Sequence, residues 1–163
     1  MKIALSTDHV GFEAVKRLKQ FLENLGHQCI DFGPEKYNPD DDYPDYIFPA
    51  AKAVAEGKCD CGIIFGGSGQ GEAMAANRIK GVRCTVFYGP VVAKNAVDVK
   101  GTTSNDPYEI VKLSRQHNHA NMLSLADRFL SEEEINTAVE AWLAAAYSEE
   151  DRHVRRVKKL DEG

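Results

Sequence analysis

The apolar and polar positions along the chain follow two periods in turn, one typical of buried strands and the other of amphipathic helices. The run "KIALS" predicts a strand over residues 2–6, and the segment 11–26 then spaces its apolar side chains as a helix does. Further strands are expected at 28–32, 61–67, 82–88 and 121–126, and further helices at 47–57, 72–79 and 131–147. Because parallel strands need crossover connections, this alternation predicts an α/β fold with a doubly wound, five-stranded, mainly parallel sheet and helices on both faces.

Three segments fall outside this alternation. The stretch 33–46 is rich in proline and aspartate and predicts a loop. The stretch 95–109, "NAVDVKGTTSNDPYE", places glycine, threonine, serine and proline between two helical pieces, and it predicts a mobile surface loop. The basic segment 148–161 predicts a helical extension at the C-terminus.

The composition limits the classes of protein to which the chain can belong. With 163 residues, of which 43% are hydrophobic and 28% charged, it is expected to form one domain over 1–163. The net charge of −5 argues against a nucleic-acid or membrane partner. The four cysteines form no CxxC pair, so they predict free thiols rather than a zinc ribbon. Neither a signal peptide nor a membrane-spanning run is recognised, and a cytoplasmic location is expected.

The glycine-rich stretch 66–72, "GGSGQGE", follows the third expected strand and leads directly into a helix. Ligands of such sheets bind beyond the carboxyl ends of the strands, where this stretch is expected to meet "STDH" at 6–9. Glycines let main-chain N–H groups approach a ligand closely, and the following helix adds its positive end, so the stretch predicts an anion hole. Its spacing fits neither a dinucleotide fingerprint nor a P-loop.

Glu72 changes the interpretation of this anion hole. Its carboxylate would repel a bound phosphate, but it suits a general base that removes a proton beside a carbonyl, next to donors that stabilise the resulting enediolate. Ser68 is placed to relay a proton between the same oxygens. The residues alone support a structural alternative equally well, in which the glycines form a tight turn and Glu72 is a favourable charge in the first helical turn.

Further polar residues follow the first strand and precede the last. Asp8 and His9 fit either a site or a turn in which Asp8 is a helix N-cap. His117 and His119 lie two residues apart, which on a helix points them in different directions and disfavours a metal pair. A solvated helix end is the simpler interpretation of these two histidines in isolation.

Arginines supply the candidate phosphate ligands. Arg128 follows the last expected strand, and Arg152 and Arg156 share one face of the C-terminal helix. This geometry suits a phosphate dianion, because guanidinium groups form charge-assisted hydrogen bonds with phosphate oxygens. A charged, solvated face is the commoner explanation for such a run.

Six motifs occur in order along the chain: "DHVGF" (8–12), "DYPDY" (42–46), "GGSGQGEAMAANR" (66–78), "GVRC" (81–84), "SRQHNHANML" (114–123) and "DRHVRRV" (151–157). Together they resemble the type B ribose-5-phosphate isomerase family, which includes galactose-6-phosphate and allose-6-phosphate isomerases. The resemblance implies a Rossmann-like fold, a homodimer or tetramer with active sites at the dimer interface, and no metal or cofactor. The C-terminal helix 148–161 is then expected to pack on the partner subunit.

The resemblance also implies a role for each candidate residue. Glu72 corresponds to the base that moves a proton between C1 and C2 of the open-chain sugar, and Ser68 to the residue that assists proton exchange between the two oxygens. One branch of the family uses a cysteine as base at the position of Gly66, so this chain is similar to the glutamate branch. Asp8 and His117 correspond to the ring-opening pair. The implied substrate-binding residues are His9, Tyr43, Gly67, Gly69, Gly71, Asn77, Asn118, Arg128, Arg152 and Arg156.

The implied reaction is the cofactor-independent interconversion of ribose 5-phosphate and ribulose 5-phosphate through a cis-enediolate. The chain departs from the family at about 91–107, where it is longer than the usual helix, so aldose phosphates with six or four carbons stay alternatives. A non-catalytic protein that binds a sugar phosphate or a nucleotide would keep the arginines and glycines but would not need Glu72. A metal-dependent isomerase is disfavoured because the sequence has no spaced cluster of histidines and carboxylates.

Overall fold

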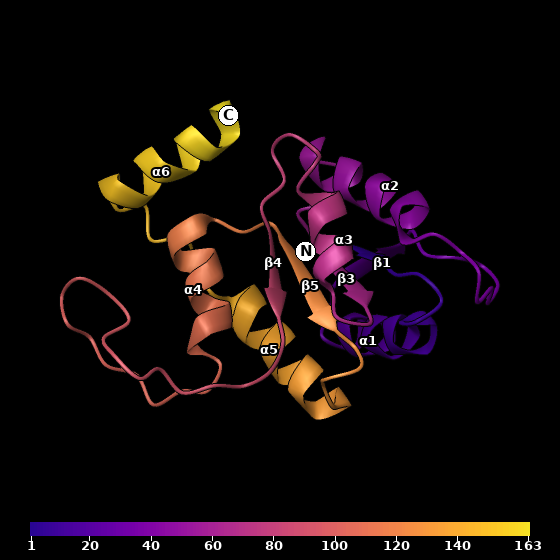
Figure 1. The fold of residues 1–163 in the computed structure, drawn as a ribbon, viewed down its shortest axis with the longest axis horizontal. Coiled ribbons are helices and arrows are strands. Elements are labelled where there is room, and N and C mark those ends of the chain that lie inside the picture. The colour runs from indigo at the N-terminus through magenta and orange to yellow at the C-terminus, as the bar shows by residue number, and fades with distance from the viewer. The chain divides into compact units, whose positions relative to one another are not determined.

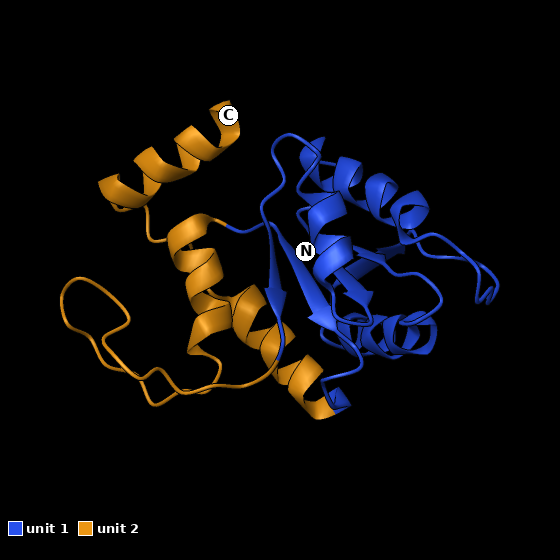
Figure 2. Ribbon diagram, in the orientation of Figure 1, with its two compact units in different colours: residues 1–88, 120–132 blue, residues 89–119, 133–163 orange.

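The computed structural model describes all residues, 1–163, and divides the chain into two compact units (Figure 2). The sheet unit comprises 1–88 and 120–132, and the helical unit comprises 89–119 and 133–163. The expectation of one domain over 1–163 stays a prediction.

A five-stranded sheet forms the centre of the sheet unit (Figure 1). The strands pair in the order β2-β1-β3-β5-β4, and every pair is parallel, as the alternation of strands and helices predicts. Because β1, β3 and β5 are neighbours, the loops that follow them emerge at the same edge of the sheet. The strand bounds are β1 Lys2–Ser6, β2 Gln28–Asp31, β3 Cys61–Gly66, β4 Cys84–Phe87 and β5 Met122–Ala126.

The helices of the sheet unit are α1 Phe12–Asn24, α2 Tyr43–Ala55 and α3 Gln70–Ala76. Alternate residues of β3 point to opposite faces of the sheet. Ile64 joins the apolar cluster under α2 and α3, whereas Ile63 and Phe65 point to the other face, where α1 lies (Figure 1). All three side chains are fully buried, which explains why β3 is apolar along its whole length.

Helix α2 begins at Tyr43, four residues before the helix expected at 47–57. Asp42 is extended at the N-cap, Pro44 lies at the start of the helix and Asp45 lies in its first turn. Proline suits this position because it lacks an N–H group, and an N–H in the first turn would have no intrahelical partner; the aspartate complements the helix dipole. The early start brings Tyr43 onto a helix rather than into the predicted loop.

The helical unit contains α4 Glu109–Asn118, most of α5 Glu132–Ala144, and α6 Asp151–Glu162. Trp142 of α5 is fully buried, and its Nε1 donates a hydrogen bond to Ser114 Oγ of α4 at 3.1 Å. The Arg115 guanidinium lies 4.5 Å from the centre of the same ring. Helix α6 confirms the helical extension expected at 148–161, although it starts at Asp151.

The chain is irregular from 88 to 108, which agrees with the loop expected at 95–109. A helix forms after that stretch, as α4, but the helical piece expected before it is absent. The base of the segment is closed by a hydrogen bond from Val91 N to Pro107 O at 2.7 Å. No helix of the chain has the length and apolar character that crossing a membrane requires.

Candidate active site

The loops after β1, β3 and β5 carry most of the candidate residues of the sheet unit. The loop after β5 is tied to the glycine loop, residues 66–71, by main-chain hydrogen bonds from Asp127 N to Gly66 O at 3.0 Å and from Arg128 N to Gly67 O at 3.3 Å. Ser124 Oγ of β5 donates to Gly69 O at 2.7 Å and is completely buried. The edge of the sheet therefore holds the glycine loop in one conformation.

Gly69 shows why glycine is needed in this loop. Its φ of 70° lies in the left-handed region, which side-chain-bearing residues rarely adopt. A Cβ at this position would also come within 2.8 Å of Ser124 Oγ and 3.2 Å of Leu125 O. Helix α3 starts immediately afterwards, where Ser68 Oγ accepts a hydrogen bond from Gln70 N at 3.4 Å.

Glu72 lies in the first turn of α3 and is buried, with 6% of the residue exposed. Its carboxyl group lies against the Cα of Gly66, so that any side chain at Gly66 would collide with it. Burial raises the pKa of Glu72 above its ordinary value, and the nearby charge of Asp8 raises this pKa further, whereas the main-chain N–H of Glu72 itself lowers it. A raised carboxyl pKa suits a general base.

Asp8 and His9 form a polar cluster with Asp41, which the sequence analysis did not single out. His9 Nδ1 lies 2.7 Å from Asp41 Oδ1 and 3.8 Å from Asp8 Oδ2. Asp8 is buried and accepts a hydrogen bond from Val10 N at 2.9 Å, so it shapes the turn after β1. It is not a helix N-cap, because Gly11 holds that position in α1.

The same three residues are the group that could hold a cation. One potential ligand atom from each of Asp8, His9 and Asp41 lies within 4.8 Å of the others. The Asp41 side chain is 3% exposed, and its Oδ2 has no hydrogen-bond partner. The sequence offered no way to select Asp41 from the neighbouring aspartates at 40–42, since only the folded loop brings it to His9.

Tyr43 and Arg128 lie over the glycine loop. A Cβ at Gly71 would come within 2.9 Å of Tyr43 Cζ, and one at Gly67 would come within 3.3 Å of Arg128 Nε. Arg128 also lines a pocket of about 480 Å³ together with His9. The structure thus brings the predicted residues of the sheet unit to one edge of the sheet, with the exception of Asn77.

The amide of Asn77 is engaged by the protein itself. Its Nδ2 donates to Cys84 O at 2.9 Å, and its Oδ1 accepts from Cys84 N at 2.8 Å. Asn77 therefore pairs with the main chain at the start of β4. This geometry gives the expected contact between Asn77 and the substrate no support.

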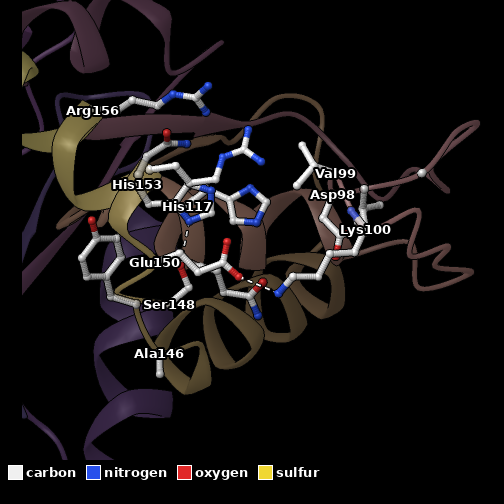
Figure 3. Close-up of a pocket in the computed structure, with 15 residues that line it drawn as sticks. Asp98, Val99, Lys100, His117, Ala146, Ser148, Glu150, His153 and Arg156 are labelled. Atoms are coloured by element: carbon white, nitrogen blue, oxygen red, sulfur yellow. Dashed lines mark hydrogen bonds and ion pairs between the residues drawn. The ribbon is translucent and has the colours of Figure 1, made fainter.

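The helical unit gathers the other predicted residues around a pocket of about 680 Å³, the arginine pocket (Figure 3). Arg152 and Arg156 line it from α6, which confirms that they share a face. His117 and Asn118 line it from the end of α4. The pocket also takes in residues that the sequence analysis missed: Asp98, Lys100, Glu150 and His153.

His117 lies against the ring of His153, and the two rings are tilted by 33°. Its ring centre lies 4.3 Å from that of His153, which is buried and whose Nδ1 lies 2.7 Å from Ser148 Oγ (Figure 3). Burial lowers the pKa of His153, and the charge of His117 lowers it further. His119 points elsewhere, as predicted: it ends α4 in a left-handed conformation and stacks on Tyr147, with ring centres 4.4 Å apart.

Comparison with known proteins gives the same family along the whole chain. The family model for Ribose/Galactose Isomerase matches residues 3–103 and 91–160. Ribose-5-phosphate isomerase B of Mycobacterium leprae is 33% identical over 162 residues, which cover 99% of this chain and 89% of that protein. A probable ribose-5-phosphate isomerase B of Mycoplasma pneumoniae is 36% identical over 158 residues, covering 97% and 91% of the two chains.

Solved structures agree with the sequence comparisons. Ribose-5-phosphate isomerase B of Clostridium thermocellum superposes with a TM-score of 0.83 at 34% identity, over 99% of this chain and 96% of the other. The enzyme of Mycoplasma genitalium, solved with bound ribulose 5-phosphate, superposes with a TM-score of 0.84 at 30% identity, over 99% and 94%. These likenesses confirm the α/β fold expected from the sequence.

Proposed function

The chain belongs to the ribose/galactose isomerase family, and from this premise we propose that it interconverts ribose 5-phosphate and ribulose 5-phosphate without a cofactor. The observation that carries the proposal is the buried carboxyl group of Glu72, which lies against Gly66 in the glycine loop. The similar enzyme of Mycoplasma genitalium binds ribulose 5-phosphate, which supports a pentose substrate.

The chemical step needs one base and a stabilised oxyanion. Glu72 takes the proton from C2 of the open-chain aldose and returns it to C1, while Ser68 assists transfer of the hydroxyl proton from O2 to O1. Main-chain N–H groups of Gly67, Gly69 and Gly71 stabilise the negative oxygen of the cis-enediolate. Reactant and product have the same atoms, so no co-reactant is needed.

Ring opening and binding use the remaining residues. Asp8 and His117 open the sugar ring: one takes the proton of the O1 hydroxyl group and the other gives a proton to the ring oxygen as its bond to C1 breaks. Tyr43 and Asn118 contact the sugar hydroxyl groups. The phosphate is bound by the cationic residues His9, Arg128, Arg152 and Arg156.

The proposal includes assembly of the chain into a homodimer or a tetramer of dimer pairs. In this assembly the arginine pocket of one subunit completes the active site of its partner, and α6 packs on the partner subunit. The support is the family resemblance together with the gathering of His117, Asn118, Arg152 and Arg156 around one pocket. A cytoplasmic location stays a prediction.

One turnover experiment tests the proposed function against two other functions. A substrate with six or four carbons stays an alternative, because residues 96–100 of the irregular segment 88–108 line the arginine pocket. A non-catalytic sugar-phosphate-binding protein would bind such ligands without turning them over. Turnover is measured with aldose phosphates of four to six carbons, with and without EDTA, because Asp8, His9 and Asp41 could hold a cation. Absence of turnover with ribose 5-phosphate, or its loss in EDTA, contradicts the proposal.

The activity is expected to fall on the acidic side of the pH profile at a pH above the ordinary glutamate pKa. Glu72 must be deprotonated to act as base, and burial raises its pKa. Lowering the pH therefore inactivates the enzyme at a higher pH than it would if the base were an exposed glutamate. The profile of kcat/KM against pH in the wild type measures this limb. A limb at the ordinary glutamate pKa contradicts the assignment.

Arg152→Ala is expected to raise KM by about tenfold or more, because one charge-assisted contact to the phosphate is lost.

A mixture of Arg152→Ala chains with Glu72→Gln chains tests whether the active site is shared between subunits. In a dimer of one chain of each kind, one site carries both substitutions and the other carries none, so an equal mixture recovers about a quarter of the wild-type sites. Activity is assayed at low substrate after unfolding and refolding the two together. No recovery above the separate variants contradicts sharing between subunits.

A further inference from the structure

The rim of the arginine pocket carries a carboxylate that an anion site should not tolerate. Glu150 lines the pocket together with Arg152 and Arg156, and it is the residue before the first turn of α6. A carboxylate near the start of a helix stabilises the helix, but in this pocket it also repels a phosphate dianion. Some group must offset the charge of Glu150 if the pocket is to bind phosphate well.

The structure provides that group on the irregular segment. Lys100 lines the same pocket, and its Nζ lies 2.9 Å from Glu150 Oε1 (Figure 3). The pairing raises the pKa of Lys100 and lowers that of Glu150, so both side chains are charged at neutral pH. Both are exposed to solvent, 71% for Lys100 and 40% for Glu150, and such surface pairs add little to stability.

Lys100 is held in place by a defined turn. Asp98 accepts hydrogen bonds from Lys100 N at 2.9 Å, Thr102 N at 3.0 Å and Thr102 Oγ1 at 2.7 Å. Val97 N donates to Thr102 O at 2.8 Å, and Gly101 is left-handed with a φ of 83°. These contacts satisfy the carboxylate of Asp98 within the turn, although Asp98 also lines the pocket. The turn thus presents a cation to the pocket, while the oxygens of its own ionised carboxylate are hydrogen-bonded within the turn, which lowers the pKa of Asp98.

We propose that Lys100, by pairing with Glu150, is a determinant of the affinity of the arginine pocket for the phosphate group. It is a positioning residue that acts through the charge of Glu150 and does not touch the reacting carbons. The inference rests on the proposed function, in which this pocket takes the phosphate end of the sugar. It gives a function to residues 96–102, which lie in the stretch that is longer than the corresponding helix of the family.

Lys100→Met tests the charge with little change in side-chain length. We expect KM for ribose 5-phosphate to rise about three- to tenfold with kcat unchanged, because the variant loses a cation and leaves Glu150 unpaired. The matched control is Lys94→Met, which removes the same charge from the same irregular segment outside the pocket and should leave KM unchanged. A structural role for the pair would instead change stability or kcat.

Two further measurements decide the inference. Adding Glu150→Gln to Lys100→Met should restore the affinity to within about twofold of the wild type, because the uncompensated anion is gone. Calorimetric titration with inorganic phosphate measures the same affinities without turnover. If the wild type turns over ribose 5-phosphate but its affinity does not depend on Lys100, or if Glu150→Gln restores nothing, the inference is overturned and the proposed function stands. If the wild type neither turns over the sugar nor binds phosphate, both are overturned.

Discussion

Glu72→Gln is expected to lower kcat by about 10³-fold while the affinity for inorganic phosphate changes by less than about twofold. The amide has nearly the same shape as the carboxylate but cannot accept the proton that the reaction moves. In the proposed site the phosphate is bound by other side chains, so we expect its binding to be kept. Steady-state turnover of ribose 5-phosphate and calorimetric titration with phosphate measure the two quantities. Unchanged kcat eliminates Glu72 as the base.

Thermal unfolding separates this result from a folding defect. The pKa of Glu72 is raised in the folded protein, so its ionised form costs stability, and this cost grows as the pH rises from the ordinary glutamate pKa through the raised one. At pH 7 the uncharged Glu72→Gln variant should therefore melt at the same temperature as the wild type or above it. The control Glu56→Gln changes an exposed glutamate at the end of α2 and should affect neither kcat nor melting beyond its exposed pair with Lys58.

Gly66→Ala is expected to lower kcat by about 10² to 10³-fold, which is close to the loss of the base itself. The added methyl group must occupy the space of the Glu72 carboxyl group, so the carboxylate is displaced from the glycine loop. Turnover of ribose 5-phosphate measures the effect. The matched control is Gly89→Ala, because a Cβ at Gly89 meets no atom within 4 Å and its φ lies outside the left-handed region.

A double variant distinguishes displacement of the base from general damage to the loop. Gly66→Cys together with Glu72→Ala supplies a thiol where the carboxylate was and removes the collision. It should be more active than Glu72→Ala alone, with an activity that rises with pH because a buried thiol has a raised pKa and acts only as thiolate. If Gly66→Ala turns over substrate as fast as the wild type, or if the double variant is no more active than Glu72→Ala, then side chains at positions 66 and 72 do not place a base at the same point in the site.

The sheet could be predicted from the sequence because its central strands are buried on both faces. The apolar runs that became β1, β3 and β5 leave no ambiguity about which segments lie in the centre. The start of α2 was missed, since the proline and aspartates that begin it are also typical of loops. The helical piece expected before residue 95 is absent, since the N–H of Val91 bonds to Pro107 O across the base of the irregular segment and not to a helical partner.

The candidate site was predictable where its residues are close together in the sequence. Glu72 and the glycines lie within one loop and one helical turn, and Arg152 and Arg156 lie one turn apart, so their proximity follows from secondary structure. Asp41 and His153 were missed because their partners lie far away in the sequence. The engagement of Asn77 by the main chain of β4 could not be predicted, because it depends on how the strand packs beside α3.

The contact between Gly66 and Glu72 also constrains how the two branches of this family can be related by descent. A chain that gained a cysteine at Gly66 while it kept Glu72 would hold two side chains in a space for one, so neither group would be correctly placed. In the proposed mechanism, a chain that lost the glutamate first would have no base at all. Single substitutions therefore lead through a poorly active ancestor in either order, which is a reason for each lineage to retain its own base once that base has been adopted.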